Sequence, residues 1–200
     1  MSYYLLFSTT NPSKEVVETF IHESERHEDA SNAWVLLRNR AQPITSRETP
    51  APVDEFASEF AGRSLEQMGA FFLQYMASDA LPAATKRWLN PDTFVVLDDR
   101  SARDRTCVVM YYEERMPEDL RERGEWVEER AEKFWLSWRV PMRTAYGVTA
   151  LLEMTPHLMV ELFEEDGPDE DGVFHYTEIE EEIDEYERGQ AEGGAEAGEE

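Results

Sequence analysis

The sequence predicts an α+β protein, in which a mixed sheet of about five strands has helices packed on its faces and is followed by an acidic, largely disordered C-terminal tail. Short apolar runs with strand character alternate with longer segments of helical periodicity, and two of the runs are continuously apolar. The charge is uneven. Residues 161–200 hold 18 of the chain's 44 acidic residues and a single base, Arg188.

The first forty residues predict a strand, a helix and a second strand. Residues 3–7 form the first apolar run. Asn11 is a suitable N-cap, and Pro12 suits the first helical position, where its missing N–H costs nothing. The helix should reach about residue 28, with an apolar face made by Val16, Val17, Phe20 and Ile21. A second strand at 34–37 completes a pattern typical of a parallel crossover.

The next segment predicts a loop and then a strongly apolar helix. Residues 41–52 contain three prolines and no periodicity. Ser64 and Gln67 form a capping box that begins a helix. Its apolar stripe indicates packing against a sheet and consists of Leu65, Met68, Phe72, Tyr75 and Met76. One or two helical turns are expected at 82–89 and should be broken by Asn90, Pro91 and Asp92.

The clearest strands are residues 94–97 and 106–112. Both are continuous apolar runs, which are typical of central strands covered on both faces. The link at 98–105 has eight residues, which allows an antiparallel hairpin.

Beyond this hairpin, the sequence predicts one more strand and two helices. Residues 113–133 are highly charged, and an amphipathic helix is expected around Trp126. Apolar and polar residues alternate over 134–140, which indicates the last strand. Pro141 then opens one helix, and a shorter one should span 156–163.

The chain divides into a globular domain at 1–163 and an acidic tail at 164–200. Nearly all aliphatic residues precede Phe163, so the core is expected to close before the tail begins. The chain ends in QAEGGAEAGEE, which has no branched or aromatic apolar residue with which to offset its ordering entropy. Within the tail, an amphipathic helix is predicted at 177–188.

Composition limits the classes of partner and the compartment. A formal net charge of −25 argues against nucleic acid and anionic membranes, because most of the surface repels phosphates. The one cysteine, Cys107, lies in an apolar run, which indicates a buried, inert thiol and a reducing compartment. No signal peptide or membrane span is evident. We therefore expect a soluble, cytoplasmic or nuclear protein.

The 98–105 link is the first candidate site. Arg100, Arg103 and Arg105 lie within six residues beyond a strand end, where they could hold a carboxylate or a phosphate. The alternative is a solvated loop whose aspartates and arginines pair with one another. Asp98 and Asp104 could form a carboxylate pair across the hairpin, but the sequence gives no sign that either is buried.

The stretch GPDEDGVFHYTE, at 167–178, resembles an EF-hand calcium loop. Asp169, Asp171 and Glu178 occupy loop positions three, five and twelve. Gly167 stands at position one and supplies no side-chain oxygen, so calcium binding should be absent or no tighter than about millimolar. A flexible acidic linker is the favoured interpretation. No metal and no cofactor are expected.

The predicted tail helix is the second candidate site. Ile179, Ile183 and Tyr186 lie at positions i, i+4 and i+7 of an otherwise anionic helix. Such a helix has little to stabilise it alone. Three interpretations remain open: it docks on the body near Arg139 and Arg143, it folds on a basic partner protein, or it is a solubilising tail.

The segments FVVLDDRSARDRTCVVMYYEE and WRVPMRTAYGVTALLEM resemble sequences from families of unknown function. This resemblance covers about the middle third of the chain, implies no activity and gives no residue a role. The sequence alone therefore favours a non-enzymatic protein-interaction domain. The alternative is an enzyme or small-anion-binding protein that uses the 98–105 link.

Overall fold

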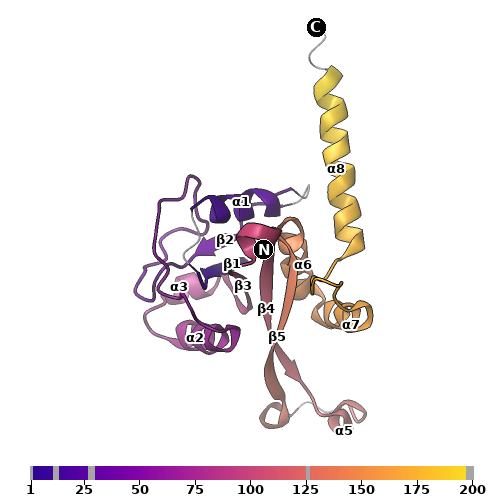
Figure 1. The fold of residues 1–200 in the computed structure, drawn as a ribbon. Helices are drawn as coiled ribbons and strands as arrows, with labels where there is room; N and C mark the ends of the chain where they lie inside the picture. Colours follow the sequence, from indigo (N-terminus) through magenta and orange to yellow (C-terminus); the bar gives the residue numbers. More distant parts are fainter. Residues whose placement is uncertain (1, 11–13, 27–29, 125–126, 197–200) are drawn as a thin grey trace.

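The computed structural model describes residues 2–10, 14–26, 30–124 and 127–196 and confirms the predicted α+β fold class (Figure 1). A five-stranded mixed sheet runs through the molecule in the order β2-β1-β3-β4-β5. The strands are β1 (Tyr3–Ser8), β2 (Trp34–Leu36), β3 (Leu89–Leu97), β4 (Thr106–Arg115) and β5 (Glu132–Pro141).

Strand pairing follows the connections. β1 pairs in parallel with β2 and β3, and β3–β4 and β4–β5 are antiparallel. The predicted crossover and the predicted hairpin are thus both confirmed. A parallel pair needs a crossover connection, whereas an antiparallel pair can be joined by the short link at 98–105.

Helices cover both faces of the sheet. The longer ones are α1 (Lys14–Ser24), α2 (Leu65–Ala77), α6 (Ala145–Met154), α7 (Pro156–Asp166) and α8 (Thr177–Glu196). The connections hold the short helices α3 (Ala83–Lys86), α4 (Ser101–Asp104) and α5 (Glu118–Arg121), and the 3-10 turns η1 (Glu128–Arg130) and η2 (Met142–Thr144).

The core has two layers, one on each face, because successive side chains of a strand point to opposite sides of a sheet. The first cluster takes Leu6, Val95 and Val109 from the strands and packs them against α1, α6, α7 and α8. The second cluster takes Phe7 and Phe94 from the strands and packs them mainly against α2. β1, β3 and β4 are thus covered on both faces, as the continuous apolar runs of β3 and β4 predicted.

β3 differs from its sequence-based prediction. It begins at Leu89 and runs through the Asn90-Pro91-Asp92 stretch that was expected to end a helix. The pairing register with β1 shifts here: Tyr3 pairs with Leu89, whereas Leu5 pairs with Phe94. This irregularity accommodates a proline, which has no N–H to donate to the ladder. The Asn90 side chain accepts the N–H groups of Asp92 and Thr93 at 2.9 and 2.8 Å.

The predicted start of α2 is confirmed, whereas Pro141, which was expected to open a helix, is the last residue of β5 and is followed by η2 before α6 begins at Ala145. The capping box of α2 is complete: Ser64 Oγ accepts the Gln67 N–H at 3.2 Å, and Gln67 Oε1 accepts the Ser64 N–H at 3.1 Å. The expected N-cap at Asn11 and the helix expected around Trp126 lie outside the described residues. The described part of 113–133 contains only α5 and η1 as helical elements.

α8 includes the predicted helix at 177–188 and continues to Glu196, while residues 197–200 lie outside the described part. Figure 1 shows α8 rising from the side of α6 and α7, with its C-terminal part extending beyond the other elements. Ile179 and Ile183 are 4% and 0% exposed and belong to the first cluster. The core therefore does not close at Phe163, because these two side chains complete one face of it.

Candidate functional site

α8 is held against α6 by its apolar stripe. Ile179 and Ile183 are four residues apart and so lie on the same helical face. Ile179 packs over Gly147 of α6, where an added Cβ would come within 2.7 Å of Ile179 Cδ1. The glycine therefore leaves the space that Ile179 fills. Tyr186, the third residue of the predicted stripe, is half-buried.

Ion pairs flank this apolar contact. Arg143 places one guanidinium nitrogen 2.8 Å from Glu180 Oε2 and another 2.7 Å from Asp184 Oδ1. Arg26, just after α1, pairs with Glu187 at 2.5 Å. The sequence left three interpretations of this helix open. In the structure the helix is docked on the body, and Arg143 is one of the basic residues that pair with it. Arg139 pairs with Asp98 instead.

His175 ties the start of α8 to the preceding loop. Its Nδ1 lies 2.7 Å from Glu180 Oε1, and its Nε2 lies 3.2 Å from Asp169 Oδ2. Burial by itself lowers the pKa of His175, but hydrogen bonds and charges from Glu180 and Asp169 outweigh it, so the pKa lies above its usual value. The imidazolium form thus stabilises this junction.

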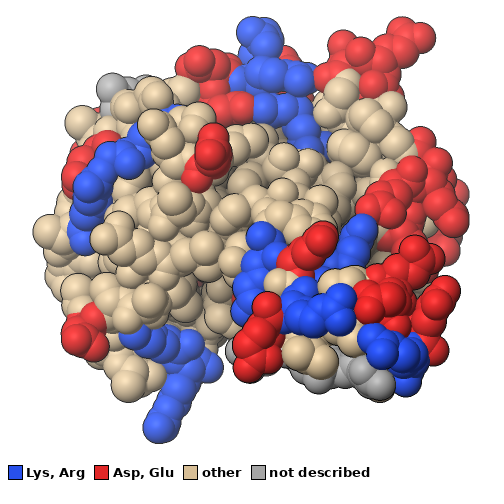
Figure 2. Space-filling view, turned by 90° about the horizontal axis from the view of Figure 1, so that it is seen from below, with Lys and Arg blue, Asp and Glu red and all other residues tan. Residues whose placement is uncertain are grey.

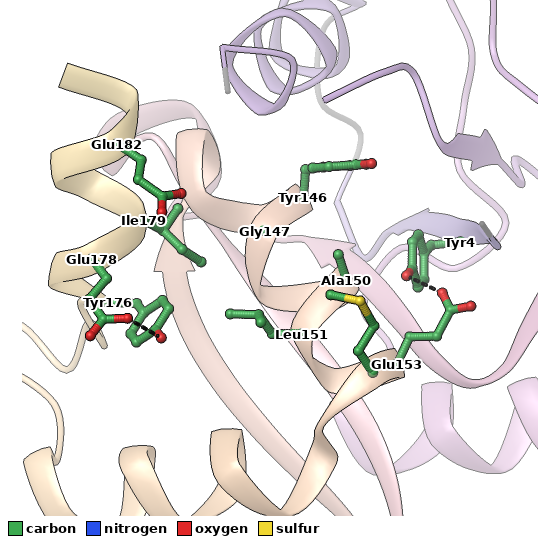
Figure 3. Close-up of a pocket in the computed structure, with 11 residues that line it drawn as sticks. Tyr4, Tyr146, Gly147, Ala150, Leu151, Glu153, Tyr176, Glu178, Ile179 and Glu182 are labelled. Atoms are coloured by element: carbon green, nitrogen blue, oxygen red, sulfur yellow. Dashed lines mark hydrogen bonds between the residues drawn. The ribbon is translucent and has the colours of Figure 1, made fainter. Parts of the chain in front are cut away.

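A groove of about 560 Å³ opens between α6 and the start of α8 (Figure 3). Apolar and aromatic side chains make most of its wall, and carboxylates lie at its ends. The lining residues are Tyr4, Tyr146, Gly147, Ala150, Leu151, Glu153, Met154, Tyr176, Glu178, Ile179 and Glu182. Met154 is one of the two most exposed large apolar side chains in the described structure.

Two tyrosine–carboxylate pairs lie on opposite sides of the groove. Tyr4 donates its hydroxyl to Glu153 Oε2 at 2.8 Å, and Tyr176 donates to Glu178 Oε2 at 2.9 Å. Burial raises the pKa of both tyrosines, and the neighbouring glutamate raises it further. Both phenols are therefore neutral donors at neutral pH. A carboxylate has about four lone-pair sites, so each glutamate can accept further donors.

The predicted anion site is split by the fold. Arg100 Nε and Arg103 Nε share the carboxylate of Asp104, at 2.6 and 2.8 Å. Arg105 has a positive φ of 52° and pairs with Glu23 at the end of α1, at 2.9 Å. The first two arginines line a cleft of about 590 Å³, and the third lies elsewhere. The sequence offered the alternative that the aspartates and arginines of this loop pair with one another. Arg100, Arg103 and Asp104 do so.

Asp98 does not pair with Asp104. Arg139 donates to both of its oxygens, and the N–H of Arg100 donates to Oδ1 at 3.0 Å. Burial alone raises the pKa of Asp98, but these donors bring it below the usual value for aspartate. The ionised side chain therefore joins the end of β3 to β5.

The calcium-loop candidate lies on the other wall of the Arg100–Arg103 cleft, through Asp169, Glu170, Asp171 and His175. Asp169 Oδ1 accepts the N–H groups of Asp171 and Val173 at 2.9 and 2.8 Å, so this carboxylate caps its own turn. Glu178 faces the α6–α8 groove. Among the described residues, no group of three or more His, Cys, Asp or Glu is arranged to hold a metal ion.

Arg100 also donates to the carbonyl of Asp171 at 3.0 Å. The two candidate sites, some seventy residues apart in the sequence, are thus in direct contact. The cleft between them carries four carboxylates against two arginines and His175, so its charge does not favour an anion.

The α6–α8 groove was not predicted from the sequence. Its residues come from β1, from α6, and from Tyr176 and the first turns of α8, and no sequence spacing connects them. The only available signal was the apolar stripe of the tail helix, which indicated that α8 needed a surface to pack on.

Comparisons with protein-family models, with curated proteins and with solved structures found no match to this chain. In the part of the chain that the structure describes, no helix has the length and apolar character needed to cross a membrane. The inference of function therefore depends on the chain's own residues.

Proposed function

We propose that this protein is a non-enzymatic interaction domain that binds a basic protein through the outer face of α8. The observation that carries the proposal is the burial of Ile179 and Ile183 against the body. Successive helical residues are about 100° apart, so Glu181 and Glu185 lie opposite the buried stripe. Both are exposed. Docking thus turns a carboxylate-rich face outward.

The distribution of charge on the surface supports this proposal. Figure 2 shows acidic side chains gathered on the side of the molecule where α7 lies, with some basic side chains among them and much of the opposite side uncharged. A concentrated field of one sign raises the rate of encounter with a partner of opposite charge. The same field disfavours nucleic acid and anionic membranes. We place this function in the cytoplasm or nucleus, in keeping with the buried, unpaired Cys107.

A full-length variant with Glu181→Gln and Glu185→Gln tests the proposal. The probe is a fluorescein-labelled, lysine-rich peptide that forms an amphipathic helix, and binding is followed by anisotropy. We expect the double variant to bind about three- to tenfold more weakly, the range for two exposed charge pairs. Affinity should also fall with added salt, since exposed charges are screened within about 8 Å at physiological ionic strength.

The matched control removes two exposed charges elsewhere, with Glu66→Gln in α2 and Asp79→Asn just after it. Equal weakening by both double variants would show that only net charge matters, and the proposed face would be wrong. The Ile179→Ser, Ile183→Ser variant keeps the charge but loses the docking contacts. If the partner recognises the docked helix, this variant should bind more weakly too.

The alternative function, an enzyme or small-anion-binding protein at the 98–105 link, has less support. Arg100 and Arg103 are already paired with Asp104, and acidic side chains face them across the cleft. To reach these two arginines, an anion would have to displace the carboxylate of Asp104, which the chain itself holds beside them. A rise in melting temperature with phosphate that disappears in Arg100→Ala would favour this alternative.

A further inference from the structure

The α6–α8 groove has a negative pole on each side and an apolar floor between them. Glu178 and Glu182 come from α8, and Glu153 lies across the groove beside Tyr4 (Figure 3). Ala150 and Leu151 of α6 lie between the two sides (Figure 3). The negative charges of the groove are therefore not gathered at one point. They lie on two sides, with apolar surface between them.

Its walls suit an organic cation. Tyr176 lines the groove and is half-buried, and a tyrosine ring attracts an ammonium group placed over its face, whereas the rings of Tyr4 and Tyr146 are buried. The neutral phenols of Tyr4 and Tyr176 are oriented by their bonds to Glu153 and Glu178. These carboxylates retain lone pairs for charge-assisted bonds from an N⁺–H donor. The volume of about 560 Å³ lies within the usual range for small-ligand sites.

These features exclude several ligand classes. Phosphates and carboxylates would be repelled by three glutamates. A bare divalent cation could bind the carboxylates on only one side of the groove, and the apolar floor would remain in contact with water. A ligand with positive charges separated by a methylene chain matches the charge and the apolar character of these three parts of the groove.

We propose that the α6–α8 groove binds a linear aliphatic diamine or polyamine. One ammonium group bonds to Glu178, with Glu182 beside it, and the other bonds to Glu153. The methylene chain lies on Ala150 and Leu151, where burial of its apolar surface contributes to binding. On α8 this site adjoins the outer face that carries Glu181 and Glu185, but its ligand does not depend on the proposed protein partner.

The test is calorimetric titration of the full chain with 1,4-diaminobutane and with spermidine, at about 0.15 M salt to screen non-specific charge. We expect saturable one-to-one binding. 1-Aminobutane has the same chain with one charge and should bind at least about tenfold more weakly, because one charge-assisted bond is lost. Magnesium chloride, which has two charges and no methylene chain, should not compete at equal concentration.

Variants locate the site. Glu178→Gln and Glu153→Gln should each weaken spermidine binding at least about tenfold, and Ala150→Trp should abolish it by filling the floor. Glu66→Gln with Asp79→Asn is the control on the opposite side of the sheet and should have no effect. Glu153 also accepts the hydroxyls of Tyr4 and Ser2, so Glu178→Gln provides a readout that does not depend on those bonds.

The outcomes separate the alternatives. Equal affinity in the parent, in Glu178→Gln and in Ala150→Trp would show a counterion atmosphere around a polyanion and would overturn the proposal. So would competition by magnesium at equal concentration, or the absence of saturable binding. Binding of a peptide with two lysines in the absence of any spermidine binding would also overturn it, because the groove would then be a peptide site.

Discussion

The two faces of the sheet are covered in different ways. On one face, α2 lies so close that an added Cβ at Gly69 would come 2.5 Å from Nε1 of Trp135 in β5. On the other face, Gly147 of α6 gives the same kind of space to Ile179 of α8. Both contacts place a large side chain over a helical glycine.

The difference lies in where the covering side chain comes from. Trp135 belongs to a strand of the sheet, so its backbone stays beside α2 for as long as β5 is paired with β4. Ile179 belongs to a helix in the acidic segment at 164–200, held by ion pairs from Arg143 and Arg26. One face is therefore closed by the body itself, and the other depends on a segment whose attachment responds to charge.

Removal of residues 164–200 should have the largest effect on stability. It uncovers the part of the first cluster beneath Ile179 and Ile183 and removes the buried Val173, and burial of one large apolar side chain contributes about 2 kcal/mol. We expect 1–163 to unfold cooperatively but several kcal/mol less stably than the full chain, by denaturant titration. A chain ending at Arg188 should match the full chain, since the contacts described between α8 and the body end at Glu187. A molten 1–163 would show that the tail is essential to the core.

The Ile179→Ser, Ile183→Ser variant should have the next largest effect. Each buried isoleucine is worth about 2–5 kcal/mol on truncation, but α8 can undock, so the total cannot exceed the loss caused by removing 164–200. Hydrogen exchange should show α8 losing protection while β3 and β4 keep theirs. Glu181→Ser with Glu185→Ser, on the outer face of α8, is the control and should change stability by less than about 1 kcal/mol. Equal exchange in both variants would argue against docking through the isoleucines.

Substitution of Gly69 and of Gly147 by alanine compares how tightly the two faces of the sheet are covered. Gly69→Ala should cost about 1–3 kcal/mol, because the indole of Trp135 and the α2 backbone cannot both stay in place. Gly147→Ala should cost less and should increase hydrogen exchange in α8 only. Gly189→Ala, at a site with nothing within 4 Å of an added Cβ, controls for the higher helix propensity of alanine. A larger cost at Gly147 than at Gly69 would reverse the comparison.

A smaller effect is expected from pH, because the attachment of α8 depends in part on the protonation of His175. The pKa of His175 is raised above its ordinary value of about 6.5, so its contribution is fully present below that value. The contribution is lost as pH rises through the folded-state pKa. Protection of α8 should therefore be greater near pH 6 than near pH 8, and His175→Gln should remove part of that difference. If the parent and the variant have the same pH profile, His175 does not hold the junction.

The smallest effects are expected at the 98–105 link. Arg100→Ala and Arg103→Ala should each change stability by less than about 0.5 kcal/mol, as is usual for surface positions. Thermal melts of the parent with and without phosphate should coincide. A larger loss in Arg100→Ala than in Arg103→Ala would indicate that the Arg100 bond to the Asp171 carbonyl helps to hold the acidic loop.

Local physical chemistry made much of this fold readable from the sequence. The capping box at Ser64 and Gln67 begins α2, and continuous apolar runs identify β3 and β4 as strands covered on both faces. Strand–helix–strand spacing gave the parallel pairing of β1 with β2. The concentration of acidic residues at 161–200, the helix within that segment and its apolar stripe were equally evident, because each is a property of neighbouring residues.

Only the tertiary structure decided which elements these helices and strands contact. It turned Ile179 and Ile183 toward Gly147 and separated Arg105 from Arg100 and Arg103. It also brought Tyr4 and Glu153 into one groove with Tyr176 and Glu178. These groups are up to about 170 residues apart in the chain, and their meeting depends on how whole helices pack on the sheet. Periodicity assigns a residue to a face of its own element, but it does not say which other element will cover that face.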